Sequence, residues 1–119
     1  LWHEDIVELF IDPEFSHRNY VHVGINHLGT VHDAWLDGGL RNRAIEWNAD
    51  AQAVAEVGRD FWSLEYRLDF GQDEVPKPES GSEWGFNFVR VFRGAEYSQW
   101  VRTYEGGHQP DDFGLLIFE

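Results

Sequence analysis

The stretch "LWHEDIVELFIDP" (residues 1–13) decides the fold class, because its apolar residues recur at every second position. Such alternation is typical of a half-buried strand. One side of this expected strand carries aliphatic residues, namely Val7, Leu9 and Ile11. The other side carries Glu8, Phe10 and Asp12, and we expect the strand to end at Asp12 and Pro13. The chain therefore opens with β structure.

The same period of two recurs along the rest of the chain. Strands are expected at residues 19–26, 31–37, 61–70, 84–93, 97–104 and 113–119. The segment "AQAVAEV" (residues 51–57) fits a helix by composition, but its short length and the "GRD" turn that follows favour a strand. Residues 71–83, with two prolines and an excess of acids, predict a loop. The sequence thus predicts an all-β fold, an antiparallel β-sandwich of immunoglobulin-like or jelly-roll-like type, as a single domain over residues 1–119.

Composition excludes several classes of function. The 119 residues include 9 basic and 22 acidic side chains, which gives a net charge of -13 at pH 7. Such a surface repels phosphate backbones and anionic lipids, so we expect neither nucleic acid nor a membrane as partner. The absence of cysteine excludes disulfides, thiolate metal sites and cysteine catalysis. The chain also lacks methionine, and we therefore expect a processed product or a piece of a longer protein.

Histidines, serines and carboxylates offer weaker candidates for chemistry. The six histidines form no HExxH motif. His22 and His32 either meet across a hairpin beside Asp33 in a zinc site or are polar residues of a sheet face. The serines lie outside any GxSxG turn, which disfavours a nucleophilic serine. Acid pairs are expected to be solvated, because a glycosidase needs two carboxylates that flank one groove.

The six tryptophans are more informative. Three of them lie in apolar strand patterns and are expected in the core: Trp62, Trp84 and Trp100. Trp2 lies outside the apolar face of the first strand, where it is either a plug at the chain end or an exposed platform. An exposed indole can pack on a sugar ring, whose hydroxyls then need polar partners at the edge. Glu8 is a candidate acceptor and Arg90 a candidate bidentate donor for such a ligand.

Five segments, in order, make the chain resemble family 9 carbohydrate-binding modules. They are "WHEDIVELFIDP" (residues 2–13), "YVHVGIN" (20–26), "FWSLEYRLDF" (61–70), "WGFNFVR" (84–90) and "SQWVRTYEGGHQPDDFGLLIF" (98–118). Each motif is weak by itself, but their order and spacing match over essentially the whole chain. The resemblance implies a β-sandwich related to DOMON-type domains that binds polysaccharide or oligosaccharide without catalysis. It also implies structural calcium and a place in a larger extracellular or periplasmic protein.

The resemblance also implies which residues bind sugar. Trp2 matches the first of two tryptophans that sandwich the ligand, Glu8 matches a polar contact, and Asn87 and Arg90 match further family positions. The second tryptophan falls near Gly107 or His108, so His108 would provide a weaker second wall. Calcium ligands are expected among acids near turns, with Asp12 and Asp33 as the candidates. Haem is not expected, because a DOMON-type axial ligand set needs a methionine.

The chain departs from the family in one larger respect, since the strands that precede the first tryptophan are absent. We therefore expect an incomplete sandwich at the N-terminal side, completed by another segment or by another chain. A structural or self-assembling β-sandwich, joined by strand donation and without sugar binding, is the alternative function.

Overall fold

The computed structural model describes residues 4–38, 43–44, 47–93, 96–103 and 106–119. Strands make up most of this part of the chain, in the order β1 (Ile6–Asp12), β2 (Asn19–Asn26), β3 (Val31–Asp37), β4 (Arg43–Ala44), β5 (Ala51–Val57), β6 (Trp62–Leu68), β7 (Glu83–Phe92), β8 (Glu96–Gln99) and β9 (Gly114–Ile117). Two short 3-10 turns, η1 (Pro13–Phe15) and η3 (Pro110–Asp112), interrupt them. The described residues contain no helix with the length and apolar character needed to cross a bilayer.

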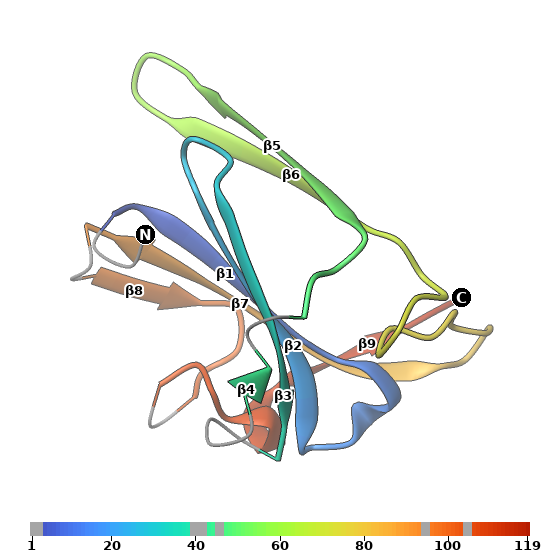
Figure 1. Cartoon of the computed structure of the whole chain (residues 1–119). Coiled ribbons are helices and arrows are strands. Elements are labelled where there is room, and N and C mark those ends of the chain that lie inside the picture. Colours follow the sequence, from blue (N-terminus) through green and yellow to red (C-terminus); the bar gives the residue numbers. More distant parts are fainter. Residues whose placement is uncertain (1–3, 39–42, 45–46, 94–95, 104–105) are drawn as a thin grey trace.

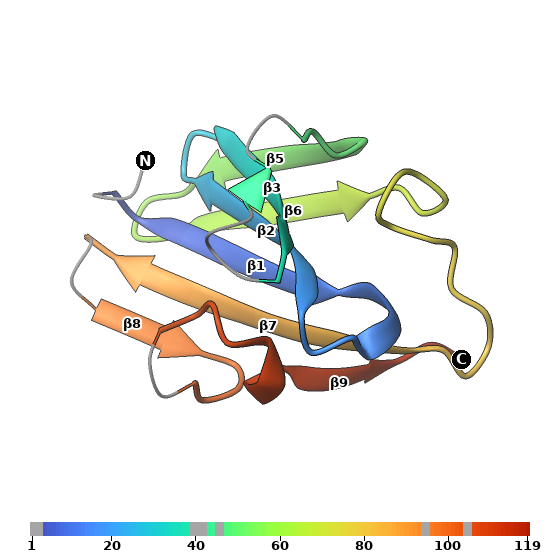
Figure 2. The ribbon, with the colours of Figure 1, turned by 60° about the horizontal axis from the view of Figure 1, so that its bottom comes forward.

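The strands form two antiparallel sheets of unequal size (Figure 1). The larger sheet has seven strands in the order β4-β3-β2-β1-β7-β8, with β9 also paired to β7. The smaller sheet is the β5–β6 hairpin, in which Ala51 pairs with Leu68 and Val57 with Trp62. In Figure 2 this hairpin lies over the β1–β3 side of the larger sheet. The predicted antiparallel β-sandwich is confirmed, and so is a strand at residues 51–57.

β1 lies at the centre of the larger sheet, between β2 and β7. It ends at Asp12 as predicted, and the Asp12 carboxylate holds the turn that follows. Asp12 Oδ1 accepts a hydrogen bond from the Ser16 amide at 2.8 Å, and Oδ2 accepts one from the His17 amide at 2.7 Å. These bonds secure a turn in which Glu14 has a φ of 74°, a left-handed conformation that costs energy for a residue with a side chain.

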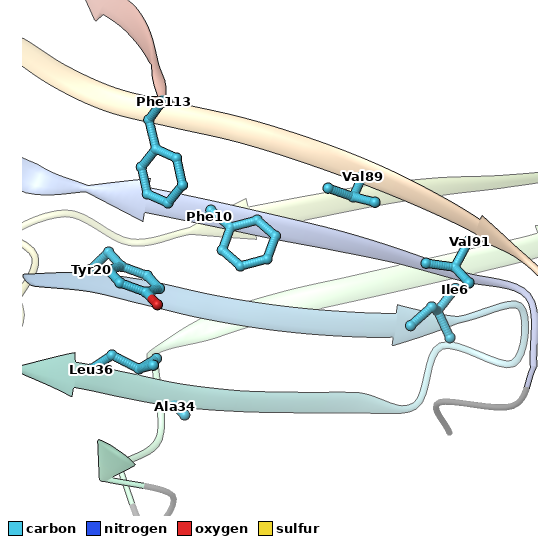
Figure 3. Close-up of a cluster of buried hydrophobic side chains, with 8 residues drawn as sticks. All are labelled: Ile6, Phe10, Tyr20, Ala34, Leu36, Val89, Val91 and Phe113. Carbon is cyan, nitrogen blue, oxygen red and sulfur yellow. The ribbon is translucent and has the colours of Figure 1, made fainter. Parts of the chain in front are cut away.

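Each face of the larger sheet has its own apolar core. We call the face covered by β5–β6 the hairpin face, where Ile11, Val21 and Val23 are buried beneath Leu64 and Tyr66 of the hairpin. We call the opposite face the loop face. Its core comprises Ile6, Phe10, Tyr20, Ala34, Leu36, Val89, Val91 and Phe113 (Figure 3). Phe113, which follows η3, packs on Phe10 and Tyr20, so the C-terminal segment covers part of the loop face.

Two expectations about burial are corrected by these layers. Alternation predicted a half-exposed strand at residues 19–26, but β2 is buried on both sides because both faces of the sheet are covered there. Trp84 is in the core as predicted, whereas Trp100 is 49% exposed. Trp100 stacks on Phe88 with 6.2 Å between ring centroids, and Phe88 is itself 41% exposed.

Candidate functional site

A carboxylate and an imidazole meet on the loop face. In the register between β1 and β2, Glu8 pairs with Gly24 and Phe10 with His22, so Glu8 and His22 are diagonal neighbours on one face. Oε1 of Glu8 lies 2.8 Å from Nε2 of His22. The His22 side chain is 3% exposed and that of Glu8 is 15% exposed. The pair is thus nearly buried, with the carboxylate as its outer member.

A second histidine reaches the same place from the C-terminal segment. Nδ1 of His108 shares a 2.7 Å hydrogen bond with the hydroxyl of Tyr20. The His108 ring stands edge-on to His22 at 4.5 Å and to Phe10 at 5.1 Å. Phe10 in turn stacks on His22, with 4.7 Å between centroids and an interplanar angle of 18°. We call these five residues the Glu8–His108 cluster: Glu8, Phe10, Tyr20, His22 and His108.

Gly107 explains how His108 comes so near the sheet. A Cβ atom at position 107 would lie 2.6 Å from Cζ of Phe10, closer than carbon atoms approach. Only a glycine therefore lets the backbone pass directly over the Phe10 ring. The resemblance placed Gly107 and His108 at the lost tryptophan, and the structure packs the His108 ring against His22, the residue that contacts Glu8.

The cluster combines an aromatic interior with polar atoms at its rim. Glu8 and His108 are only partly buried, while Tyr20 and Phe10 beneath them are sealed. Oε2 of Glu8 accepts no hydrogen bond from the residues that the structure describes, so it can accept one from a ligand hydroxyl. Oriented polar groups of this kind are one part of the sites that take small polar ligands.

Asn87 has a different environment from the one that a ligand contact needs. It is fully buried in β7, where its amide group bridges to the segment after β8. Nδ2 donates to the Val101 carbonyl at 3.0 Å, and Oδ1 accepts from the Val101 amide at 2.9 Å and the Phe88 amide at 3.0 Å. Its polar groups therefore stabilise the fold, and none is directed at the Glu8–His108 cluster.

Arg90 lies on the other face of the sheet. In the register, Glu8 pairs with Val89 and Val7 pairs with Arg90, which places Arg90 on the hairpin face. Its guanidinium lies 5.2 Å from the centre of the Phe92 ring. The structure thus links Glu8 to His108 through His22 on the loop face and places Arg90 on the opposite face. Trp2, the expected stacking platform, lies outside the described residues.

The expected metal ligands are engaged in other contacts. Asp12 is fully buried, and its two oxygens already accept hydrogen bonds in the turn after β1. Asp33 Oδ2 accepts from the Ala49 amide at 3.1 Å. Within the described ranges, no three histidine or acidic side chains gather as a metal site would require. Asp12 and Asp33 thus have partners within the fold, and the structural calcium ion stays a prediction.

The zinc interpretation of the paired histidines also finds no support in the strand register. His22 pairs with Ala34 and His32 with Gly24, so the two histidines are diagonal neighbours on the loop face. Asp33 pairs with Val23 and therefore lies on the hairpin face, away from both histidines. The structure gives His22 a carboxylate partner, Glu8, which sequence reasoning missed. The sequence did contain a signal for this contact, because alternation places Glu8, Tyr20 and His22 on the polar faces of their predicted strands.

A larger apolar cleft of about 910 Å³ lies on the hairpin face. It runs between β6 and the part of the large sheet formed by β1, β7 and β9. Its lining includes Leu9, Trp62, Leu64, Phe86, Phe88 and Leu116. The cleft and the Glu8–His108 cluster therefore lie on opposite faces of one sheet.

Comparison with known proteins supports the architecture. No protein-family model matches the chain, and no curated protein matches it significantly. A solved structure from Bacteroides uniformis ATCC 8492, named a "putative carbohydrate-binding protein", superposes on 99% of this chain with a TM-score of 0.78 at 19% sequence identity. The two chains share one fold. This chain spans 62% of the length of that neighbour, and membership of family 9 stays a prediction.

Proposed function

We propose that this chain is a non-catalytic carbohydrate-binding module that takes a polysaccharide or oligosaccharide on the loop face, at the Glu8–His108 cluster. The observation that carries the proposal is the 2.8 Å contact between Glu8 and the buried His22, which holds a partly exposed carboxylate in one orientation. The family resemblance and the name of the structural neighbour support the same ligand class.

The chemistry of the cluster suits a sugar. A pyranose offers hydroxyl donors, and the Glu8 carboxylate accepts hydrogen bonds that are stronger than those of a neutral acceptor. His108, held by Tyr20 and packed against His22, offers a partly buried imidazole in the same cluster. Trp2 lies six residues before Glu8 in the sequence, and in this proposal its indole packs on the C–H face of the ring.

The proposal leaves Asn87 and Arg90 out of the site. Asn87 uses its amide to hold the chain after β8, and Arg90 lies on the opposite face. The ligand therefore contacts fewer polar side chains than the resemblance implies. We expect an affinity weaker than that of a site with two tryptophan walls, because one good aromatic contact contributes on the order of 1 kcal/mol.

The wider setting of the module is also a proposal. By its resemblance, the chain works in the extracellular space or the periplasm as part of a larger secreted protein. A structural calcium ion belongs to the same expectation, and a melting temperature that falls when a chelator is added would support it.

The test is titration of the purified chain with xylan, cellulose and their oligosaccharides, followed by calorimetry. The proposal predicts saturable binding to at least one glycan and a loss of at least fivefold in affinity for Trp2→Ala. Release of reducing sugar from the same substrates, retained in Trp2→Ala and lost in Glu8→Gln, would point to a glycosidase instead. Absence of binding across the panel would refute the proposal.

A further inference from the structure

Two imidazole rings lie against each other within the Glu8–His108 cluster. The rings of His22 and His108 stand edge-on, with 4.5 Å between their centroids. Nε2 of His22 lies 2.8 Å from Oε1 of Glu8, and the His22 side chain is only 3% exposed. Nδ1 of His108 shares a hydrogen bond with the hydroxyl of Tyr20. One imidazole thus contacts a carboxylate, whereas the other contacts a hydroxyl and the first imidazole.

The two positions differ in how well they accommodate a positive charge. Imidazole is the side chain that ordinarily gains a proton between about pH 8 and pH 5. A protonated His22 would form an ion pair with Glu8 and keep its stacking contact with Phe10. A protonated His108 would bring a second positive charge against that ring, in a nearly buried region where water screens repulsion poorly. The geometry therefore favours one proton on the pair and opposes a second.

Three further carboxylates near the loop face are engaged elsewhere or lie in solvent. Both oxygens of Asp12 accept hydrogen bonds in the turn after β1. Glu4 accepts a hydrogen bond of 2.7 Å from the side chain of Asn26, at the end of β2. The side chain of Asp111, in η3, is 86% exposed, and a charge so placed contributes little. Glu8 is the carboxylate in contact with the pair.

The strands that flank β1 and β2 bring no acidic side chain onto this face near the pair. On β3, His32 is a diagonal neighbour of His22, so its protonation would add positive charge to the same region. On β7, the residues that point to the loop face are uncharged: Gly85, Asn87, Val89 and Val91. Acid therefore accumulates positive charge around the pair.

The chain around His108 can move while its neighbours stay in place. Gly106 has a φ of 99°, and Gly107 follows it directly. Because glycine restricts the backbone less than any other residue, two in succession allow a hinge. Beyond the segment, Phe113 is anchored separately in the core of the loop face. This arrangement allows residues 106–109 to leave the sheet without Phe113.

We propose that His22 and His108 form a proton-operated latch. The latch holds residues 106–109 on the loop face when at most one of the two imidazoles is protonated, and it releases them when both are. Because the unfolded chain takes the second proton freely, the closed state is stable at neutral pH and loses stability as the pH falls below about 6. The consequence for ligand binding rests on the proposed function: release removes His108 from the sugar site, so glycan affinity falls at acid pH.

Spectra of the chain without sugar test the latch. Long-range ¹H–¹⁵N spectra between about pH 8 and pH 5 follow both imidazoles, and amide exchange, corrected for its intrinsic pH dependence, follows residues 106–109. We expect the two rings to titrate in separate steps, about one pH unit or more apart, with His108 second. Protection of residues 106–109 should fall at least tenfold across the second step.

His108→Gln is the diagnostic variant, because glutamine keeps a polar side chain near Tyr20 but gains no proton. Protection of residues 106–109 should then stay constant with pH, whereas His27→Gln, which changes a histidine beside Trp62, should keep the full loss. Rings that titrate independently in the unchanged chain, protection that does not change with pH, or an equal loss in His108→Gln would each overturn the proposal. A chain that shows both steps and the release but binds no glycan would refute the sugar site and support the latch.

Discussion

Glu8 and His22 form a carboxylate–imidazole contact of 2.8 Å across two neighbouring strands, with the histidine side chain 3% exposed and the glutamate 15% exposed. The register between β1 and β2 creates this contact, because it sets the two residues diagonally on the loop face. His22 is also wedged between Phe10 and His108, so its ring has little freedom to move. The Glu8 carboxylate is consequently held ready for a ligand at little entropic cost.

Glu8→Gln tests the role of the carboxylate charge. Glutamine keeps the shape and can still contact His22, but a hydrogen bond to a neutral amide is weaker than one to a charged group. We expect sugar affinity to fall at least tenfold, while the free energy of unfolding falls by only about 1 kcal/mol. Calorimetry and urea unfolding measure the two effects. Glu65→Gln, on the exposed side of β6, is the matched control and should change neither quantity.

Tyr20→Phe tests the anchoring of His108. The substitution removes the hydroxyl that shares a 2.7 Å hydrogen bond with Nδ1 of His108, in a fully buried position. We expect the free energy of unfolding to fall by about 1–2 kcal/mol and sugar affinity to fall several-fold, because the His108 ring loses its orientation. Urea unfolding and glycan titration check this. Affinity equal to that of the unchanged chain, with lower stability, would show that His108 is not part of the site.

Substitutions at Asn87 and Arg90 test whether these two residues act in fold stability or in glycan binding. Asn87→Ala leaves the Val101 and Phe88 amides without their buried acceptor, which should cost about 2–4 kcal/mol of unfolding free energy. Arg90→Ala, at an exposed position on the hairpin face, should change stability by less than about 1 kcal/mol and leave glycan affinity unchanged. Loss of glycan binding in Arg90→Ala, with the fold intact by circular dichroism, would contradict the placement of the site on the loop face.

The ionisation of Tyr66 determines how the stability of the fold should depend on pH in the alkaline range. Burial raises the pKa of the Tyr66 hydroxyl well above its ordinary value of 10.0, and the nearby Asp33 carboxylate raises it further. Because the folded state then ionises at higher pH than the unfolded state, stability is fully present below pH 10 and is lost as the pH rises above it. Urea unfolding between pH 9 and about pH 11 measures this loss.

Tyr66→Phe should remove the contribution of this residue to the alkaline loss. The Tyr66 hydroxyl is buried without a hydrogen-bond partner among the residues that the structure describes, so its removal should not destabilise the fold at neutral pH. Tyr97→Phe is the control, because Tyr97 is 65% exposed on β8. A pH dependence in Tyr66→Phe as steep as that of the unchanged chain would contradict the assignment.

Local patterns predicted the strands well and predicted their surroundings less well. Alternation located β1, and Asp12-Pro13 located its end, because both signals depend on neighbouring residues. The burial of β2 on both sides depends on the hairpin and the C-terminal segment, which contact it from distant parts of the sequence. The same holds for Trp100, whose apolar surroundings in the sequence predicted burial although it is 49% exposed.

In the candidate site, too, local patterns predicted some features, while others depend on contacts between distant parts of the sequence. Glu8 and His108 were predicted as sugar-binding residues from the resemblance, and the structure places both in contact with His22. Asn87 and Arg90 are three residues apart in one strand, so strand parity alone places them on opposite faces. The partnership of Glu8 with His22 required the register between β1 and β2, which local patterns do not determine.

Long-range ¹H–¹⁵N spectra of the histidine imidazoles during titration with xylo-oligosaccharides test the central claim most directly. The account predicts saturable shifts of the His22 and His108 ring nitrogens, because His22 contacts the Glu8 carboxylate and the His108 ring packs against His22. It also predicts that the backbone amide signals of Phe88 and Arg90, whose side chains lie on the hairpin face, do not shift. Glycan binding that shifts the amides of Phe88 and Arg90 and leaves both imidazoles unchanged would contradict it.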